Sequence, residues 1–165
     1  MKPKISLLLV TATFALPFTQ LVTADELMIA DKGATEATIV VSPQAGTWEK
    51  QAATDLVLYI ERMSGAKVPI ANTPESIAAA QKAKTPLLII GLEALKAEPD
   101  LGKDLAKVAK KNAELQADAI VLRRAGNRVY LAGANDDSHY FAVAELLRRW
   151  GCRRYLPSDS GECIP

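Results

Sequence analysis

The apolar runs of the chain predict strands with different surroundings. Residues 37–42 form a β-branched run that ends at a proline and a Gln-Ala-Gly turn, which is typical of a strand followed by a loop. Residues 67–71 are also extended, but the proline within them favours an edge strand. Residues 86–91 are apolar on both faces, which indicates a strand that is covered on both sides. We therefore predict 86–91 as the central strand.

A helical pattern lies between the first two runs. Thr47 is its expected N-cap and Gly65 its expected stop. Apolar residues recur at helical spacing between them, so one face of the helix should be buried. The predicted buried face carries Trp48, Ala52, Leu56, Tyr59 or Ile60, and Met63, while Glu49, Lys50, Asp55, Glu61 and Arg62 fall on the other faces.

The middle of the chain predicts two further helices. Residues 74–84 are rich in alanine and indicate a short helix. Residues 92–114 are charged and lysine-rich, and Pro99 and Gly102 interrupt them early. We therefore expect a loop after residue 91 and a solvated helix from about Lys103.

The last third of the chain predicts a hairpin and a capped helix. Residues 118–124 and 128–132 flank an Ala-Gly-Asn turn, the strongest hairpin pattern in the chain. Residues 140–150 follow with helical spacing, closed by Gly151, and 152–156 indicate a short final strand. Asn135 or Asp136 is the expected cap of this helix, and its predicted apolar stripe consists of Phe141, Ala144, Leu147 and Trp150.

These elements together predict the fold class. Strands that alternate with helices imply parallel crossovers, and the hairpin adds an antiparallel pair. We therefore expect an α/β (α+β) domain with a mixed β-sheet and helices packed on its faces.

The first 24 residues have a different composition from the rest. Lys2 and Lys4 precede a mostly apolar run, and Val-Thr-Ala at 22–24 resembles a cleavage site. The alternative is a membrane anchor, but the apolar run is interrupted and shorter than the roughly 20 residues that a spanning helix needs. We interpret residues 1–24 as a signal peptide, which predicts a secreted or periplasmic protein with no membrane association after cleavage.

The net charge argues against two classes of partner. Cleavage would remove two of the 20 basic residues and none of the 19 acidic ones, which leaves a formal charge of 18 minus 19, or −1. A nearly neutral chain has no general attraction for nucleic acid or for an anionic membrane.

The two cysteines, Cys152 and Cys163, lie close together in the closing stretch. In an exported protein they could form a disulfide that staples the final turn. They could equally be two small hydrophobic side chains, and the sequence does not decide between these alternatives. A zinc site is not expected, because His139 is the only histidine available to join the two thiolates.

The most polar stretch is Gly-Ala-Asn-Asp-Asp-Ser-His at residues 133–139. It places Asp136, Asp137, Ser138 and His139 after a strand, at the edge where open α/β sheets bind ligands. The alternative is the capped start of a helix, where acidic residues are favourable. We favour the cap, because adjacent residues do not make a catalytic triad and a single histidine in a first helical turn is more often structural.

Arginine is concentrated towards the end of the chain. Seven of the eight arginines lie between residues 123 and 154, and they include the pair Arg153 and Arg154. Clustered guanidinium groups can bind carboxylates or phosphates, which would suit an acidic glycan or a partner domain. We prefer the alternative, in which these side chains lie on scattered solvated faces. No nucleotide-binding fingerprint is present, so we expect no cofactor.

Six motifs in order resemble one domain family. They are the helix that ends in Met63-Ser64-Gly65, then Val68-Pro69-Ile70, Leu88-Ile89-Ile90-Gly91, residues 129–136, residues 140–147, and Gly151-Cys152 through Tyr155-Leu156-Pro157 with Gly161-Glu162. This series resembles the N-terminal α/β domain that precedes the catalytic barrel in α-glucuronidases and β-N-acetylhexosaminidases. Its greatest likeness is to large secreted bacterial proteins of uncharacterised function that carry this domain before a glycoside-hydrolase-like barrel. The family usually has a glycine near the position of Ser138 or His139, which this chain lacks.

The resemblance implies a division of the chain and a role. Residues 25–36 would be a lead-in, 37–157 an accessory domain with a β-hexosaminidase domain-2-like fold, and 158–165 the start of a linker to a C-terminal catalytic barrel that is absent here. The family's catalytic acids lie in the barrel, so no catalytic residue transfers to this chain. The resemblance therefore implies a non-catalytic domain of a secreted glycoside-hydrolase-like protein.

Two other hypotheses remain from the residues alone. One is an exported binding module that recognises an acidic saccharide or a protein through the arginine cluster. The other is a small hydrolase built on residues 136–139, which we consider the weakest of the three.

Overall fold

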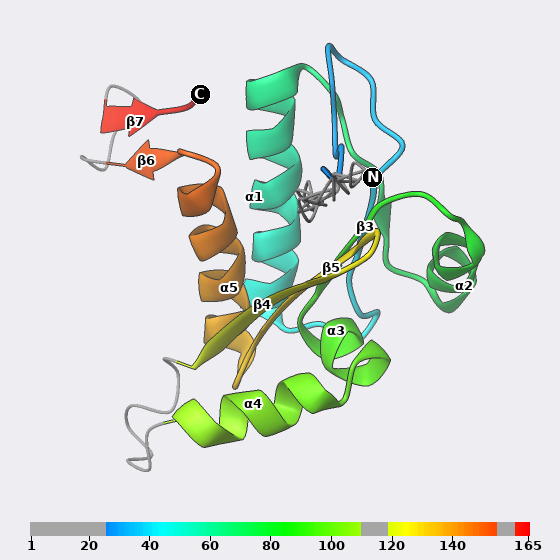
Figure 1. Cartoon of the computed structure of the whole chain (residues 1–165), viewed down its shortest axis with the longest axis vertical. Coiled ribbons are helices and arrows are strands. Elements are labelled where there is room, and N and C mark those ends of the chain that lie inside the picture. Colours follow the sequence, from blue (N-terminus) through cyan, green and yellow to red (C-terminus); the bar gives the residue numbers. More distant parts are fainter. Residues whose placement is uncertain (1–25, 110–118, 155–160) are drawn as a thin grey trace, which may run out of the picture.

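A computed structural model describes residues 26–109, 119–154 and 161–165. The expected signal peptide lies outside these residues. Strands and helices alternate along most of the chain (Figure 1). In order they are β1 (Thr38–Val40), α1 (Thr47–Ser64), β2 (Ile70–Ala71), α2 (Pro74–Lys82), β3 (Leu87–Ile90), α3 (Gly91–Ala97), α4 (Asp100–Val108), β4 (Ile120–Ala125), β5 (Arg128–Gly133), α5 (Asp136–Arg149), β6 (Arg153–Arg154) and β7 (Glu162–Cys163).

The main sheet has five strands in the order β2-β1-β3-β5-β4. β1 pairs in parallel with β2 and β3, β3 pairs in parallel with β5, and only the β4–β5 hairpin is antiparallel. The predicted mixed α/β sheet is therefore confirmed. β3 occupies the centre with every residue buried, and β2 forms an edge, as the patterns at 86–91 and 67–71 predict.

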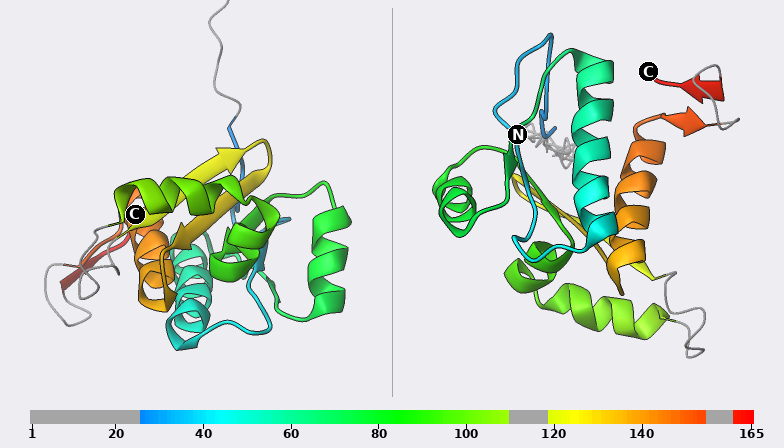
Figure 2. Two further views of the ribbon diagram at one scale, coloured as in Figure 1. Left: turned by 90° about the horizontal axis from the view of Figure 1, so that it is seen from below. Right: turned by 180° about the vertical axis from the view of Figure 1, so that it is seen from behind.

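Helices cover both faces of the sheet. Because successive side chains of a strand point to opposite faces, each strand contributes to two separate cores. Ile39, Leu88 and Leu131 pack with α1 and α5, while Val40, Ile89 and Tyr130 pack with α2, α3 and α4. Figure 2 shows α1 and α5 side by side, with the β4–β5 hairpin between them and α4.

The strand order reverses direction between β1 and β3. The chain moves from β1 to its neighbour β2, and then crosses back over β1 to form β3. Since crossovers between parallel strands are right-handed, this reversal places α1 and α2 on opposite faces. The carboxyl ends of β1 and β3 therefore meet at a topological switch point, the usual position of ligand sites in open α/β sheets.

The predicted buried faces of α1 and α5 are confirmed in part: Ala52, Leu56, Ile60 and Leu147 are buried as predicted, but other positions differ. α1 buries Glu49, Ala52, Ala53, Leu56 and Ile60. Trp48, predicted to be buried, is 49% exposed, and Glu49, predicted to be solvated, is buried. Phe141 of the predicted α5 stripe is likewise 48% exposed, while Ala142, Val143 and Leu146 face the sheet. Both helices have apolar residues on two faces, so helical spacing alone does not identify the buried face.

The region after β3 is more helical than predicted. Residues 92–102 were expected to form a loop, but α3 follows β3 directly and α4 begins at Asp100. Pro99 is the N-cap of α4 and not a break, because a helix needs no N–H donor there. Leu101 and Leu105 give α4 its buried face. The predicted continuation of this helix to residue 114 lies outside the described residues.

Helix ends follow the local sequence at three of the four predicted positions, since Gly151, with φ of 98°, also closes α5. Gly65 ends α1 with φ of 75°, as predicted for a left-handed stop. Asn135 caps α5, also as predicted. Thr47 is not the N-cap of α1, however; Gly46 occupies that position and has no side chain to cap the helix.

The chain ends in a separate two-stranded sheet. β6 lies within the short strand predicted at 152–156, and it pairs with β7 so that Arg153 lies opposite Cys163 and Arg154 opposite Glu162. β7 lies in the residues expected to open a linker. This part of 158–165 is therefore folded back onto the domain.

Candidate functional site

The polar loop at 133–139 is a helix cap. The Asn135 side chain accepts a hydrogen bond from the backbone N–H of Ser138 at 3.0 Å, and the Ser138 hydroxyl accepts one from the N–H of Asn135 at 2.9 Å. This reciprocal pair satisfies donors at the start of α5. The capping interpretation of the sequence is confirmed.

His139 and Ser138 are not arranged for catalysis. Both are buried, and His139 Nδ1 accepts a hydrogen bond from the backbone N–H of Gly133 at 2.9 Å. Burial lowers the pKa of His139, which favours the neutral imidazole. The Ser138 hydroxyl bonds to Asn135. No nucleophile–base pair therefore exists here, and the small-hydrolase hypothesis loses its site.

Asp136 has a role that the sequence did not reveal. Its carboxylate accepts hydrogen bonds from the backbone N–H groups of Trp48 and Glu49, both at 3.0 Å. These are donors in the first turn of α1, so a residue of α5 supplies the cap that Gly46 lacks. A Cβ at Gly46 would lie within 2.3 Å of this carboxylate, so the contact requires glycine. Asp137, its neighbour, is exposed.

Glu49 is a buried acid with a strongly raised pKa. It lies beside the β3–α3 junction, where its Oε1 accepts a hydrogen bond from the N–H of Leu92 at 3.2 Å and its Oε2 has no hydrogen-bond partner among the described residues. Burial raises the pKa of Glu49 to about 7, the charges of Asp136 and Glu93 add to the effect, and the Leu92 N–H opposes it. Gly91, with φ of 56°, leaves the space that the carboxyl group fills. The sequence does contain an indication that Glu49 is buried. Glu49 falls on the same helical face as Ala52, Ala53, Leu56 and Ile60.

The arginines do not form one cluster. Arg123 pairs with Glu98 and with Asp104 of α4, while Arg148 and Arg149 both pair with Glu145 on α5. These arginines therefore lie on separate parts of the surface, as we predicted from the sequence.

Arg153 and Arg154 bind groups of their own chain. Arg153 donates to the backbone carbonyls of Arg148 and Cys152, the latter at 2.8 Å. Arg154 pairs with Glu162 at 3.1 Å. These contacts hold β6 in place, so neither arginine is arranged primarily for an external anion.

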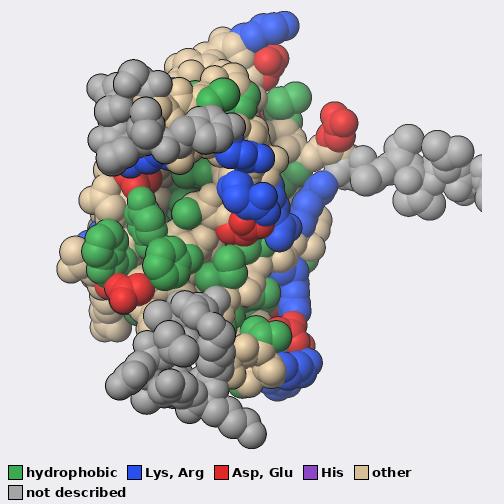
Figure 3. Space-filling view, turned by 90° about the vertical axis from the view of Figure 1, so that its left-hand side faces the viewer, with side chains coloured by type: hydrophobic (Ala, Val, Ile, Leu, Met, Phe, Trp, Pro, Cys, Tyr) green, Lys and Arg blue, Asp and Glu red, His purple; other side chains and the backbone are tan. Residues whose placement is uncertain are grey.

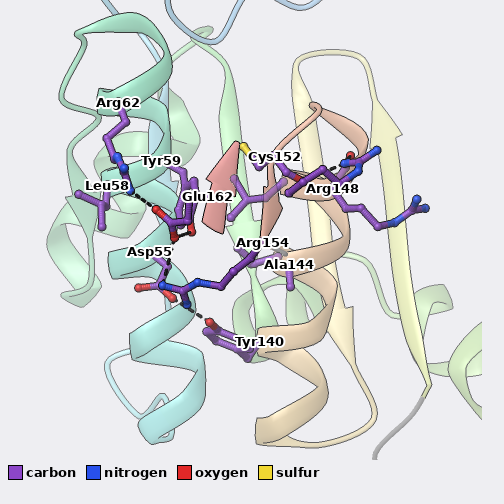
Figure 4. A pocket seen from close by; sticks show the side chains of 13 residues that line it. Asp55, Leu58, Tyr59, Arg62, Tyr140, Ala144, Arg148, Cys152, Arg154 and Glu162 are labelled. Atoms are coloured by element: carbon purple, nitrogen blue, oxygen red, sulfur yellow. Dashed lines mark hydrogen bonds and ion pairs between the residues drawn. The ribbon is translucent and has the colours of Figure 1, made fainter. Parts of the chain in front are cut away.

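Glu162 fastens the end of the chain to α1 (Figure 4). Its carboxylate accepts hydrogen bonds from the Tyr59 hydroxyl at 2.6 Å and from Arg62 at 2.5 Å, in addition to the pair with Arg154. The bond from Tyr59, followed by that from Arg62, lowers the pKa of Glu162, and the same bond raises the pKa of Tyr59 to about 12. The side chain of Glu162 is only 4% exposed. We call this group of contacts the Glu162 clamp.

The Glu162 clamp borders a groove of about 540 Å³ between α1 and α5. We call it the α1–α5 groove; its walls include Leu58, Tyr140 and Ala144. At one end Tyr140 stacks edge-on between Trp48 and Phe141, with ring centres 5.6 and 6.4 Å apart, and its hydroxyl donates to Asp55 at 2.9 Å. Figure 3 views the molecule from this side and shows hydrophobic side chains gathered on the surface. The groove therefore has a polar border at the Glu162 clamp, and the exposed rings of Trp48 and Phe141 lie beside its Tyr140 wall.

The two cysteines are separate thiols. Cys152 is buried, with its Sγ 3.7 Å from the sulfur of Met63, and Cys163 is exposed. Cys163 lies opposite Arg153, the residue after Cys152. Cys152 packs as a small buried residue, whereas the exposed Cys163 does not.

The described residues offer no other obvious chemistry. Across residues 26–109, 119–154 and 161–165, no group of three or more His, Cys, Asp or Glu side chains is placed to hold a metal ion. None of the helices in the same part of the chain has the length and apolar character that crossing a membrane requires.

Comparison with known proteins does not identify a family. No protein-family model matches the chain, and no curated protein matches it.

Proposed function

We propose that the chain is a non-catalytic accessory domain of a secreted carbohydrate-active protein. In this proposal it has the fold of the β-hexosaminidase domain that precedes a barrel, and its α1–α5 groove packs against that catalytic barrel. The proposal extends the family resemblance of the six sequence motifs.

One observation carries the proposal. α1 and α5 each bury an apolar face against the sheet, yet they also expose Trp48, Leu58 and Phe141 on the outer side. An outer helix face is normally polar, and an exposed apolar patch is characteristic of an interaction surface. The aromatic residues here are of the type that is enriched at protein interfaces.

The Glu162 clamp supports the same arrangement. It holds β7 against α1, and Pro165 lies beside Gly151 at the end of α5. Residues that follow Pro165 would therefore leave the domain next to the α1–α5 groove. A barrel joined there would reach the groove without a long linker.

The DNA downstream of the Pro165 codon provides the first test. We expect it to continue in frame into a barrel-sized region. A well-supported stop codon directly after Pro165, with no barrel encoded nearby, would argue strongly against the proposal.

The surface itself is tested in the protein that includes the downstream region. Hydrogen exchange should be slower at the α1 and α5 surfaces in the longer protein than in this chain alone. Phe141→Asp should separate the two domains in limited proteolysis, because it places a charge in an apolar contact. Val108→Asp is the matched control, since Val108 is a similarly exposed apolar residue on α4. Equal proteolysis of the two variants would count against an interface at the groove.

A further inference from the structure

Both cysteines lie at the two-stranded sheet that ends the chain. Cys152 directly precedes β6, and Cys163 of β7 is paired with Arg153, the residue after Cys152. Paired Cα atoms of antiparallel strands are about 4.5–5.5 Å apart and successive residues rise by about 3.4 Å, which places the Cα atoms of Cys152 and Cys163 roughly 6 Å apart. A disulfide bridges Cα atoms that are about 4.4–6.8 Å apart. The two backbones are therefore close enough for a disulfide to join them.

The two thiols nevertheless face different sides of this small sheet. The Sγ of Cys152 lies 3.7 Å from the sulfur of Met63 on α1, and Cys152 lines the α1–α5 groove together with Glu162 (Figure 4). Within β7, Glu162 points to α1, where Tyr59 and Arg62 bind it. Since successive residues of a strand point to opposite sides, Cys163 points away from α1, which agrees with its exposure.

A disulfide would require Cys163 to turn towards α1. The same alternation would then carry Glu162 to the outer side of β7, away from Tyr59 and Arg62. β7 is paired with β6 through only two residues, so few backbone hydrogen bonds oppose this rearrangement. The disulfide and the Glu162 clamp are therefore alternatives, because each needs the side of β7 that faces α1.

We propose that Cys152 and Cys163 form a redox switch, in which a disulfide between them replaces the Glu162 clamp and reduction of the disulfide restores the clamp. The oxidant is a low-molecular-weight disulfide. The switch would make the attachment of the chain end to α1 depend on the redox state of the surroundings. It is independent of the proposed accessory function, because it involves only the two thiols and the clamp.

The exposed thiol of Cys163 reacts first. Its thiolate attacks one sulfur of the oxidant, so that a mixed disulfide forms and one thiolate leaves. Burial raises the pKa of Cys152, so this thiol is the poorer first nucleophile and acts second. Once deprotonated, Cys152 attacks the sulfur of Cys163 and releases the second thiolate. The protein thus gives up two protons and two electrons, and the oxidant becomes two thiols.

A redox titration with glutathione tests the switch. The purified chain is equilibrated with graded mixtures of oxidised and reduced glutathione, quenched with N-ethylmaleimide and analysed by mass spectrometry. We expect a monomer that has lost two hydrogens and yields a peptide in which Cys152 is linked to Cys163. Two free thiols in excess oxidised glutathione, a persistent glutathione adduct on Cys163, or cross-links between chains alone would overturn the proposal.

Single variants test the order of attack. Cys152→Ser should stop at the glutathione adduct on Cys163, because the second thiol is missing. Cys163→Ser should leave the buried Cys152 largely unreacted over the same time. Faster adduct formation on Cys152 than on Cys163 would contradict the proposed sequence of steps.

A further comparison tests whether the disulfide excludes the Glu162 clamp. Glu162→Gln removes the charge that binds Arg62 and Arg154, so the equilibrium constant for disulfide formation should rise about fivefold or more. Glu145→Gln, which removes ion pairs confined to α5, is the control and should leave this constant unchanged. An equal constant for Glu162→Gln and the unmodified chain would show that the disulfide and the clamp coexist, which would refute the switch.

Discussion

Glu49 should make the stability of this domain depend on pH. Burial raises its pKa from 4.5 to about 7 in the folded state. A carboxyl group with a raised folded pKa stabilises the fold while it is protonated, and this contribution is lost as pH rises through the folded value. The domain should therefore lose stability between mildly acidic and mildly alkaline solution, opposite to the usual behaviour of paired surface acids.

The size of this loss of stability follows from the shift in the pKa of Glu49. A displacement from 4.5 to about 7 corresponds to about 3 kcal/mol over the full titration. Between about pH 5.5 and about pH 8 the loss should be about 2 kcal/mol. His139 acts in the other direction, because its lowered pKa costs stability as pH falls below its ordinary value. A comparison of variants is needed to separate the contributions of Glu49 and His139 to the pH dependence of stability.

The assay is urea unfolding followed by tryptophan fluorescence at the two pH values. Glu49→Gln has no titrating group at this position, so its loss of stability across the range should be smaller than that of the unmodified protein by about 2 kcal/mol. His139 is present in both proteins and cancels in the difference. Glu61→Gln, an exposed position on the same helix, should behave like the unmodified protein. Parallel pH profiles for Glu49→Gln and the unmodified protein would refute the reasoning.

Two further predictions concern contacts between distant segments. Asp136→Ala should lower the free energy of unfolding by about 1–3 kcal/mol, measured by urea unfolding, because it removes both hydrogen bonds at the start of α1; Asp137→Ala, at an exposed position, should change it by less than about 0.5 kcal/mol. If the two variants are equally stable, the cap is not a significant contact. Glu162→Gln should speed hydrogen exchange in β6 and β7, because it removes the charge that binds Arg62 and Arg154. Glu145→Gln, which removes two ion pairs confined to α5, should leave that exchange unchanged, and a change of equal size in both would contradict the clamp.

Local patterns were sufficient for much of the fold. The apolar run at 86–91 predicted the central strand because burial on both faces removes alternation. The turn at 125–127 predicted the hairpin, and Gly65 and Asn135 marked helix ends through their own backbone and side-chain properties. Each of these depends on neighbouring residues alone.

The features that were missed depend on distant residues. The Asp136 cap joins residues 88 positions apart, and the bond from Tyr59 to Glu162 spans 103 positions. The predicted buried faces of α1 and α5 were wrong at Trp48 and Phe141, which are exposed, because each helix has a second apolar face. The apolar positions alone therefore fit either orientation against the sheet. Only the packed sheet distinguishes the face that enters the core from the face that remains outside.

The Asp136 cap also has a consequence for the order of folding during synthesis. A ribosome completes α1 long before it adds Asp136, so the nascent helix lacks a partner for its first N–H groups for much of translation. α1 reaches its full native stability only when α5 docks beside it. A fragment that ends before residue 136 should therefore lack a native α1, and the first and last helices should form as one cooperative unit.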